Sequence, residues 1–400
     1  MTLNMAPKIT LPRRISILGA TGSIGVSTLD VLNQAGGREQ FEVVALTGMG
    51  NVDLLAAQAK AVGARIAVTA DDTRYHDLKT ALAGSGIEAA AGAEALCAAA
   101  AEPVDWVMAG IVGIAGLAPT MAAARAGATI ALANKECLVS AGDLFLAETG
   151  KAGVTVVPVD SEHSAIHQCL AGEPHHTIER IILTASGGPF RNFNIDQMRD
   201  VSPAQAAGHP KWSMGQKISI DSASMFNKAL EMIEARHLFH VKPNQIEVVV
   251  HPQSIVHSAV CFSDGSMIAQ MGMPDMRTPI AYALAYPSRL AVNVKPLDLV
   301  ALSRLDFEAP DELRFPALRL AREAMAHGKA ASAVLNGAKE AALEAFIGGK
   351  IKFLDIAQTV EAVLDILSQL PAPQNLEDVF DADLLARRYA GELFLGVSRK

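Results

Sequence analysis

Short apolar runs alternate with amphipathic stretches over the first 160 residues of the chain. The first run, RISILG at 14–19, ends in glycine and precedes residues 24–33, whose apolar positions recur at helical spacing. Further strand-like runs continue the alternation: FEVVAL at 41–46, RIAVT at 65–69, WVMAG at 106–110 and TIALAN at 129–134. Strands separated by helices in this way predict an α/β fold, with an N-terminal, Rossmann-like, doubly wound parallel sheet over residues 1–160.

The pattern changes after residue 160. IERIILTAS and IEVVVH read as strands, and VHSAVCF and SMIAQMG flank Ser263, Asp264 and Gly265, a combination typical of a β-hairpin. We therefore predict a central α+β domain with a connecting segment over residues 161–311. The remainder, 312–400, predicts a helical domain, because its apolar positions follow helical spacing at 317–327, 331–347 and 355–370.

Composition narrows the class of protein. Half of the 400 residues are hydrophobic and 19% are charged, as in a well-packed globular chain of more than one domain. The net charge of -8 predicts neither nucleic acid nor an anionic membrane as partner. The four cysteines form no CxxC pair, and no apolar stretch is long enough to cross a bilayer or to form a secretory signal. We expect a soluble, cytoplasmic protein.

The glycine-rich turn GATGSIG at 19–25 joins the first predicted strand to the first predicted helix. Glycines allow a tight turn, and the N–H groups at a helix start attract a pyrophosphate, so the turn indicates a dinucleotide site. The alternative is a glycine turn that only lets strand and helix pack closely.

Two polar triplets directly follow strand-like runs. Asn134-Lys135-Glu136 follows TIALA, and ligands bind at the carboxyl ends of strands in open α/β sheets. Asp160-Ser161-Glu162 follows TVVPV, and its two carboxylates offer the oxygen ligands that a hard divalent ion prefers. In both places the alternative is an ordinary helix start with a capping residue.

Asn227, Lys228 and Glu231 lie three and four residues apart in a predicted helix that follows Asp221-Ser222. One helical face thus presents an amide, an ammonium and a carboxylate, which suits a phosphate and a metal ion. The alternative is a solvated helix face with a weak ion pair.

Two glycine-containing loops complete the candidates. The stretch GHPKWSMG at 208–215 suits a lid over a substrate, or else Trp212 anchors the loop to the core. SGGP at 186–189 suits an anion-binding nest or a plain tight turn. His163, His251 and His257 receive no role, because a lone histidine beside apolar strands is more often a core residue.

The motifs resemble one enzyme family when they are taken in order. GATGSIG, LANKE, PVDSEH, SGGPF, HPKWSMG, KISIDSAS, NKALE, HPQSIVHS and PDMRTPIAY are similar to those of the 1-deoxy-D-xylulose 5-phosphate reductoisomerases over nearly the whole chain. The resemblance implies a homodimer with an NADPH-binding domain, a catalytic domain with a mobile lid near 206–216, and a helical domain.

The resemblance also implies roles for particular residues. Mg2+ or Mn2+ would be bound by Asp160, Glu162 and Glu231, which with Lys135 form the catalytic set. The sugar phosphate would contact Lys135, Ser161, Glu162, Ser186, His209, Trp212, Ser222, Asn227, Lys228 and Glu231. NADPH would contact Thr21, Gly22, Ser23, Ile24, Asn51, Asn134, Glu136 and Gly215.

The implied reaction is the rearrangement and NADPH-dependent reduction of 1-deoxy-D-xylulose 5-phosphate to 2-C-methyl-D-erythritol 4-phosphate, a step of non-mevalonate isoprenoid precursor synthesis. One alternative is another NAD(P)-dependent reductase of a small phosphorylated or semialdehyde substrate. A second is a non-catalytic NADPH-binding sensor, although a sensor has no need of three carboxylates.

The chain departs from the family pattern at a few positions. The family usually places Lys or Arg just before the Asn that corresponds to Asn51, but this chain has Met49-Gly50 there, which leaves the preference for NADPH over NADH open. Cys137 and Ala229 replace a usual Ser and Gly. The segment 336–340, Asn-Gly-Ala-Lys-Glu, has lost the usual second Asn.

Overall fold

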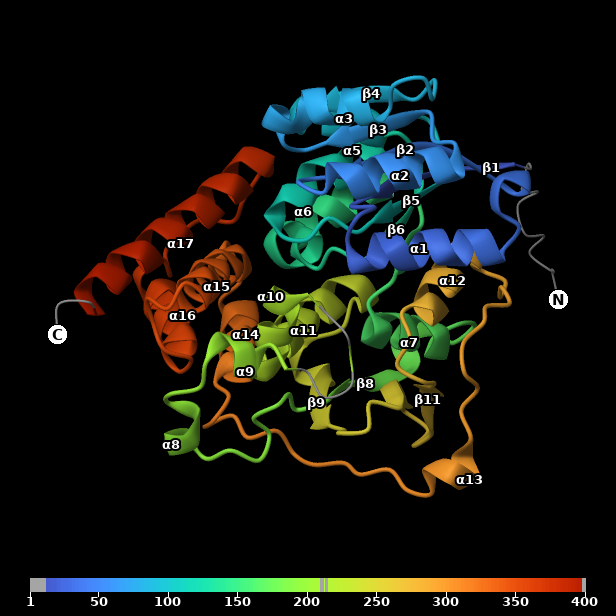
Figure 1. Ribbon diagram of the computed structural model, residues 1–400. Helices are drawn as coiled ribbons and strands as arrows, with labels where there is room; N and C mark the ends of the chain where they lie inside the picture. The colour runs from blue at the N-terminus through green and yellow to red at the C-terminus, as the bar shows by residue number, and fades with distance from the viewer. Residues whose placement is uncertain (1–11, 209–211, 213–214, 398–400) are drawn as a thin grey trace. The chain divides into compact units, whose positions relative to one another are not determined.

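The computed structural model describes residues 12–208, 212 and 215–397, and the chain divides into two compact units (Figure 1). The first unit comprises residues 1–134, 145–164 and 275–295, and the second comprises 135–144, 165–274 and 296–400. Each unit is therefore assembled from separate stretches of sequence.

The first unit is built on a seven-stranded parallel sheet with the order β4-β3-β2-β1-β5-β6-β7. Its strands are β1 (Arg13–Leu18), β2 (Phe41–Gly48), β3 (Ile66–Thr69), β4 (Glu88–Ala91), β5 (Trp106–Ala109), β6 (Thr129–Leu132) and β7 (Val156–Pro158). Its helices between strands are α1 (Ser23–Gln34), α2 (Val52–Val62), α3 (Tyr75–Ala81), α4 (Gly92–Ala100) and α5 (Leu117–Arg125). The predicted α/β class with a doubly wound parallel sheet is confirmed.

Helices cover both faces of this sheet. Apolar residues of α1, α2 and α3 pack on one face, and those of α4 pack on the other. The first face also receives α12 (Arg277–Ala285), whose Ile280 and Leu284 are fully or almost fully buried in the same core. Trp106 of β5 donates its indole N–H to the Ala283 carbonyl oxygen at 3.1 Å. The unit thus includes a helix encoded far from its sheet.

The second unit contains a mixed four-stranded sheet with the order β11-β10-β8-β9. Its strands are β8 (Ile178–Ala185), β9 (Ile246–Val250), β10 (Val256–Phe262) and β11 (Met267–Met271). β8 and β9 are parallel, whereas β10 is antiparallel to both β8 and β11. The predicted hairpin is confirmed, because β10 and β11 pair across the turn at Gly265, whose φ is +85°.

Helices form the rest of the second unit. They are α8 (Ile195–Met198), α9 (Pro203–Ala206), α10 (Gln216–Ala223), α11 (Phe226–Phe239), α13 (Leu299–Leu302), α14 (Ala317–His327), α15 (Ala331–Ile347), α16 (Asp355–Ile366) and α17 (Leu376–Val397). α11 packs against β8 and β9 of the mixed sheet and also against α14 and α15. The described part of 312–397 contains helices and no strand, as the spacing predicted.

Two helices span the division between the units: α6 (Glu136–Ala152), which is interrupted at Ala141, and α7 (Ser161–Cys169).

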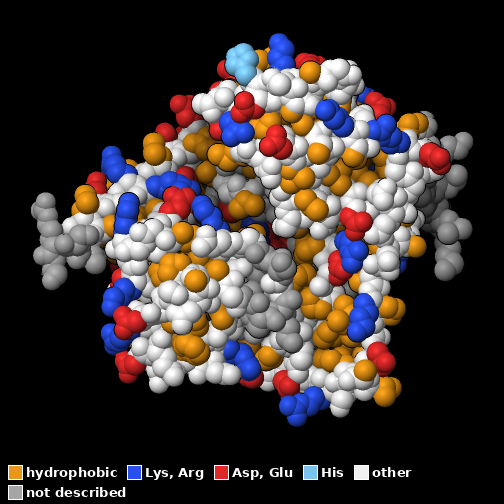
Figure 2. Space-filling view, viewed as in Figure 1, with side chains coloured by type: hydrophobic (Ala, Val, Ile, Leu, Met, Phe, Trp, Pro, Cys, Tyr) orange, Lys and Arg blue, Asp and Glu red, His pale blue; other side chains and the backbone are white. Residues whose placement is uncertain are grey.

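The surface of the protein carries charges of both signs. On their solvent-facing sides α14 and α17 have i,i+4 ion pairs such as Arg319–Glu323 at 2.8 Å. Figure 2 shows basic and acidic side chains interspersed on the face of the molecule that it displays. Among the described residues, no helix combines the length and apolar character that crossing a membrane requires.

Candidate active site

The glycine turn lies at the point where the strand order of the first sheet reverses. β1 is paired with β2 on one side and with β5 on the other, and Gly19 follows β1 with φ +87°. A Cβ on Gly19 would lie 2.7 Å from the Gly110 carbonyl oxygen, and one on Gly25 would lie 2.4 Å from the Gly19 carbonyl oxygen. These contacts require glycine, and the reversal point of a doubly wound sheet is where dinucleotides bind.

The start of α1 is open to an anion. The helix begins at Ser23, and its N-cap is Gly22, which has no side chain to cap the first N–H groups. These groups and the helix dipole favour a negatively charged ligand. Thr21, Gly22, Ser23 and Ile24 therefore lie where a pyrophosphate fits.

Other predicted cofactor residues lie at the same edge of the first sheet, because Asn51 follows β2 and Asn134 follows β6. Asn51 caps α2, and its side-chain oxygen accepts the Leu54 N–H at 3.2 Å. The Asn134 amide donates to the Gly113 carbonyl oxygen at 2.8 Å and also to Ile111. Asn134 thus fixes the loop that follows β5, rather than acting only as a helix cap.

Asp160 and Glu162 also lie at this edge, because they follow β7. Their carboxylates offer one oxygen each within 4.8 Å of one another, and Ser161 donates a hydrogen bond to Glu162. The Asp160 carbonyl oxygen accepts the Ser164 N–H at 2.8 Å, which fixes the first turn of α7. Two neighbouring carboxylates of this kind fit a hard divalent ion.

The second unit holds a cluster of charged residues around Glu231 on α11. Lys135 Nζ lies 2.8 Å from Glu231 Oε1, the Asn227 amide donates to the same oxygen at 2.5 Å, and Lys228 pairs with Oε2. Glu231 is fully buried and Lys228 is 3% exposed. The alternative of a solvated helix face is therefore wrong, and the face is a buried polar cluster.

The residues predicted to hold the phosphate lie in segments that touch. Gly188, two residues after Ser186, has φ +66°, and a Cβ there would lie 2.9 Å from the Ser222 carbonyl oxygen. Ser222 is near the end of α10, and Met225, with φ +63°, turns the chain directly into α11. The loop that carries Ser186 therefore contacts the end of α10 at Ser222. The start of α11, with Asn227 and Lys228, follows Ser222 within a few residues of the chain.

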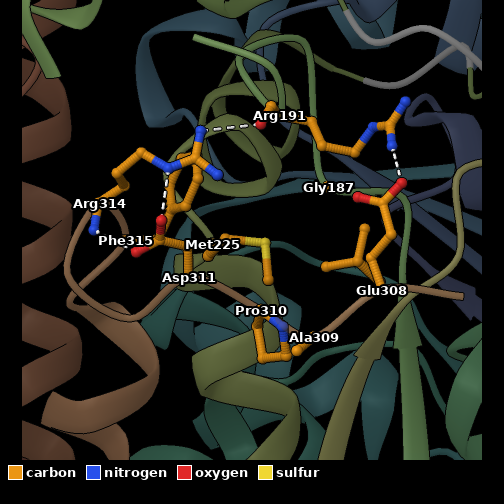
Figure 3. Close-up of a pocket in the computed structure, with 10 residues that line it drawn as sticks. Gly187, Arg191, Met225, Glu308, Ala309, Pro310, Asp311, Arg314 and Phe315 are labelled. Atoms are coloured by element: carbon orange, nitrogen blue, oxygen red, sulfur yellow. Dashed lines mark hydrogen bonds and ion pairs between the residues drawn. The ribbon is translucent and has the colours of Figure 1, made fainter. Parts of the chain in front are cut away.

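A pocket beside Gly187 is lined by paired side chains (Figure 3). Arg191 pairs with Glu308, and Arg314 Nε lies 2.7 Å from Asp311 Oδ2. Arg314 also donates to the Arg191 carbonyl oxygen at 2.9 Å. These contacts join the loop that carries Gly187 and Arg191 to residues 308–315.

Three predicted residues fall in the stretch 206–216 that the sequence predicts as a lid. The Trp212 ring lies against the His257 ring with centroids 6.0 Å apart, a contact that the sequence did not indicate. Gly215 is the N-cap of α10. His209 lies outside the described residues.

His251 is a structural residue, since its ring stacks on Phe307 and its Nε2 accepts the Ile255 N–H at 3.1 Å.

The doubly wound sheet with its glycine turn is typical of nucleotide-binding enzymes, and the carboxylate clusters are of the kind that suits a divalent metal. Comparison with known proteins gives the family. The model described as "1-deoxy-D-xylulose 5-phosphate reductoisomerase" matches residues 15–142, and two models of the C-terminal domains of this enzyme match 156–239 and 271–389.

Whole proteins agree with the family models. The reductoisomerase of Rhizobium meliloti is 62% identical over 97% of this chain and 100% of its own length, and that of Sinorhizobium medicae is 62% identical over 96% and 99%. The Zymomonas mobilis enzyme in complex with NADPH has a TM-score of 0.90 at 51% identity, over 96% of this chain and 99% of that one.

A second solved reductoisomerase, in complex with NADPH, fosmidomycin and magnesium, has a TM-score of 0.92 at 45% identity, again over 96% and 99% of the two chains. The chain belongs to the 1-deoxy-D-xylulose 5-phosphate reductoisomerase family.

Proposed function

We propose that this chain rearranges 1-deoxy-D-xylulose 5-phosphate and reduces the product with NADPH to 2-C-methyl-D-erythritol 4-phosphate, using a divalent metal, in non-mevalonate isoprenoid precursor synthesis. As a member of its family it is an NADPH-dependent oxidoreductase and isomerase. The observation that supports the proposed site is the burial of Glu231 between Lys135 and Lys228. Burying a carboxylate with two ammonium groups costs free energy, and clusters of this kind are concentrated at functional sites.

The cofactor residues proposed are Thr21, Gly22, Ser23, Ile24, Asn51, Asn134, Glu136 and Gly215. The open start of α1 would bind the pyrophosphate, and Asn134 would hold the loop after β5 in the shape that the nicotinamide half needs. NADPH, when bound, supplies the hydride for the reduction.

The metal ligands proposed are Asp160, Glu162 and Glu231, which offer only carboxylate oxygens. This donor set fits Mg2+ or Mn2+ better than a softer ion. The metal, when bound, acts as a Lewis acid toward the oxygens of the sugar. Lys135 would remain beside Glu231 and stabilise negative charge on the reacting end of the substrate.

The substrate phosphate would be held by Ser186, Ser222, Asn227 and Lys228, with His209 on the lid side. Ser161 would contact the hydroxyl groups, and Trp212 would cover the sugar and exclude water. Gripping the phosphate away from the reacting carbons orients those carbons toward the metal and the nicotinamide.

The functional division proposed is a cofactor domain at 1–160, a catalytic domain with its lid at 161–311 and a helical domain at 312–400.

We further propose a cytoplasmic homodimer that pairs through the β11 edge of the mixed sheet. The side chains of Met267 and Ile268 on this edge strand are 55% and 41% exposed, and an uncovered apolar edge favours pairing with a second copy.

The test is NADPH consumption with 1-deoxy-D-xylulose 5-phosphate, after metal removal and after addition of Mg2+ or Mn2+. We expect turnover only when sugar, cofactor and metal are all present. NADPH binding without turnover would indicate the sensor, and equal turnover without metal would indicate a different reductase.

A further inference from the structure

A buried polar face runs along α15, the central helix of the helical region. Asn336, Lys339 and Glu340 stand three and four residues apart and are 0%, 1% and 5% exposed. The face meets two other elements: Asn336 donates to the Ser140 hydroxyl of α6 at 3.3 Å, and Lys339 reaches Asp221 of α10. A lysine this deeply buried is rare unless its charge is matched.

Lys339 contacts two carboxylates. Its Nζ lies 3.0 Å from Asp221 Oδ2 and 2.6 Å from Glu340 Oε1. The other oxygen of Glu340 lies 3.3 Å from Lys217 Nζ, whose side chain is 42% exposed at the rim of the cluster. Lys339 is therefore the buried cation that directly joins α15 to α10.

Three buried carboxylates lie around Lys339, namely Asp221, Glu340 and Glu136. Burial raises the pKa of Asp221 and that of the buried Glu136, and the charge of Lys339 opposes both shifts. Burial would also raise the pKa of Glu340, but Lys339 and Lys217 lower it to about 2. Without Lys339, these carboxylates would lose the cation that directly contacts Asp221 and Glu340, and Lys217 and Lys135 would remain nearby.

We propose that Lys339 is a positioning residue for the substrate-phosphate site, which it controls by holding Asp221, and with it the adjacent Ser222, against α15. This inference rests on the proposed function, because the phosphate role of Ser222 belongs to it. The segment 336–340 has lost the second Asn that is usual in the family.

The path from Lys339 to the phosphate residues is short. Asp221 precedes Ser222, and the Ser222 carbonyl oxygen is in contact with Gly188 of the loop that carries Ser186. α10 is only eight residues long, so a displaced Asp221 moves the end of the helix. Binding groups must be held to within about 0.5 Å of their productive geometry, and phosphate binding is therefore the property that depends on this contact.

The test compares Lys339→Met with the wild-type enzyme. We expect the KM for 1-deoxy-D-xylulose 5-phosphate to rise about tenfold or more, because an orienting contact behind the phosphate site is lost. The kcat should change by less than about threefold, since Lys135 and Glu231 at the reacting end keep their contacts. Lys339→Arg should recover most of the lost affinity.

A double-variant cycle shows whether Lys339 acts through Asp221. Asp221→Asn alone should raise KM, and the pair Lys339→Met with Asp221→Asn should raise it no further than the larger single effect. If Lys339→Met does not fold, Asp221→Asn and Lys339→Arg test the same contact. The matched control is Lys352→Met, which removes an exposed pair with Asp200 and should leave KM unchanged.

An unchanged KM in a folded Lys339→Met enzyme overturns the proposal, and so do effects of Lys339 and Asp221 that simply add. A wild-type enzyme without metal-dependent turnover refutes the proposed function instead, so the two failures are distinguishable.

Discussion

Lys135 lies with its Nζ 2.8 Å from Glu231 Oε1, although the two residues are 96 positions apart in the sequence. Lys228 takes the other carboxylate oxygen from within the same helix. Glu231 therefore holds two ammonium groups, one on each carboxylate oxygen, in a fully buried position. This arrangement makes Glu231 the most sensitive single position of the proposed site.

Glu231→Gln should lower kcat/KM by about a thousandfold, because the amide removes a metal ligand and leaves the two lysines without their carboxylate. The Kd for NADPH, measured by fluorescence, should change by less than about threefold. Glu247→Gln on β9 is the control, since Glu247 is exposed and pairs only at the surface with Arg180. Equal losses of turnover and of NADPH affinity would contradict the metal role.

Gly25→Ala should weaken NADPH binding about tenfold or more and lower stability by about 1–3 kcal/mol, because the new Cβ would meet backbone atoms at 2.4 Å. Calorimetric titration and thermal unfolding measure the two effects. Gly150→Ala in α6 is the matched control, since its Cβ meets nothing within 4 Å and alanine favours a helix by up to about 1 kcal/mol. If Gly25→Ala binds NADPH normally, the turn is not the pyrophosphate site.

Gly50→Arg should raise the preference for NADPH over NADH by about tenfold, because a guanidinium beside Asn51 would pair with the 2'-phosphate. The position has room, as a Cβ on Gly50 meets nothing within 4 Å. The measurement is kcat/KM with each cofactor. Gly50→Ala fills the same space without charge, so a similar change in both variants would exclude the electrostatic explanation.

His167 should make the protein less stable as the pH falls from 6.5 toward 4. Burial, together with the nearby His175, lowers the pKa of His167 to about 4, so between these values the unfolded chain takes up a proton that the folded chain does not. This contribution to the free energy of unfolding is intact above pH 6.5 and is lost as the pH approaches 4.

The check is thermal unfolding of the wild type and His167→Gln at pH 7 and pH 5. The midpoint of thermal unfolding should fall between pH 7 and pH 5 in both proteins. The fall should be smaller in the variant than in the wild type, by about 2 °C or more. Equal losses in both proteins would mean that His167 does not titrate in this window.

Local spacing determined much of the architecture. Short apolar runs located β1, β2, β3, β5 and β6 and the hairpin of the second sheet, and helical spacing located α14 and α15. A strand covered on both faces is apolar nearly throughout, whereas a helix is apolar along its buried face. The weak strand Glu88–Ala91 was not predicted, since its sequence EAAA lacks β-branched or aromatic residues. The helix Leu376–Val397 was also missed as a separate element.

The motifs, taken in order, indicated the family and the candidate site residues from the sequence alone, because each motif is a short block of consecutive residues. The tertiary structure decided which of these side chains are buried and what they contact. Three contacts join segments that are far apart in the chain. They are the pairing of Lys135 with Glu231, the packing of residues 275–295 on the first sheet and the burial of Lys339 beside Asp221. Such contacts depend on how whole elements pack, and no local pattern of apolar and polar residues records that packing.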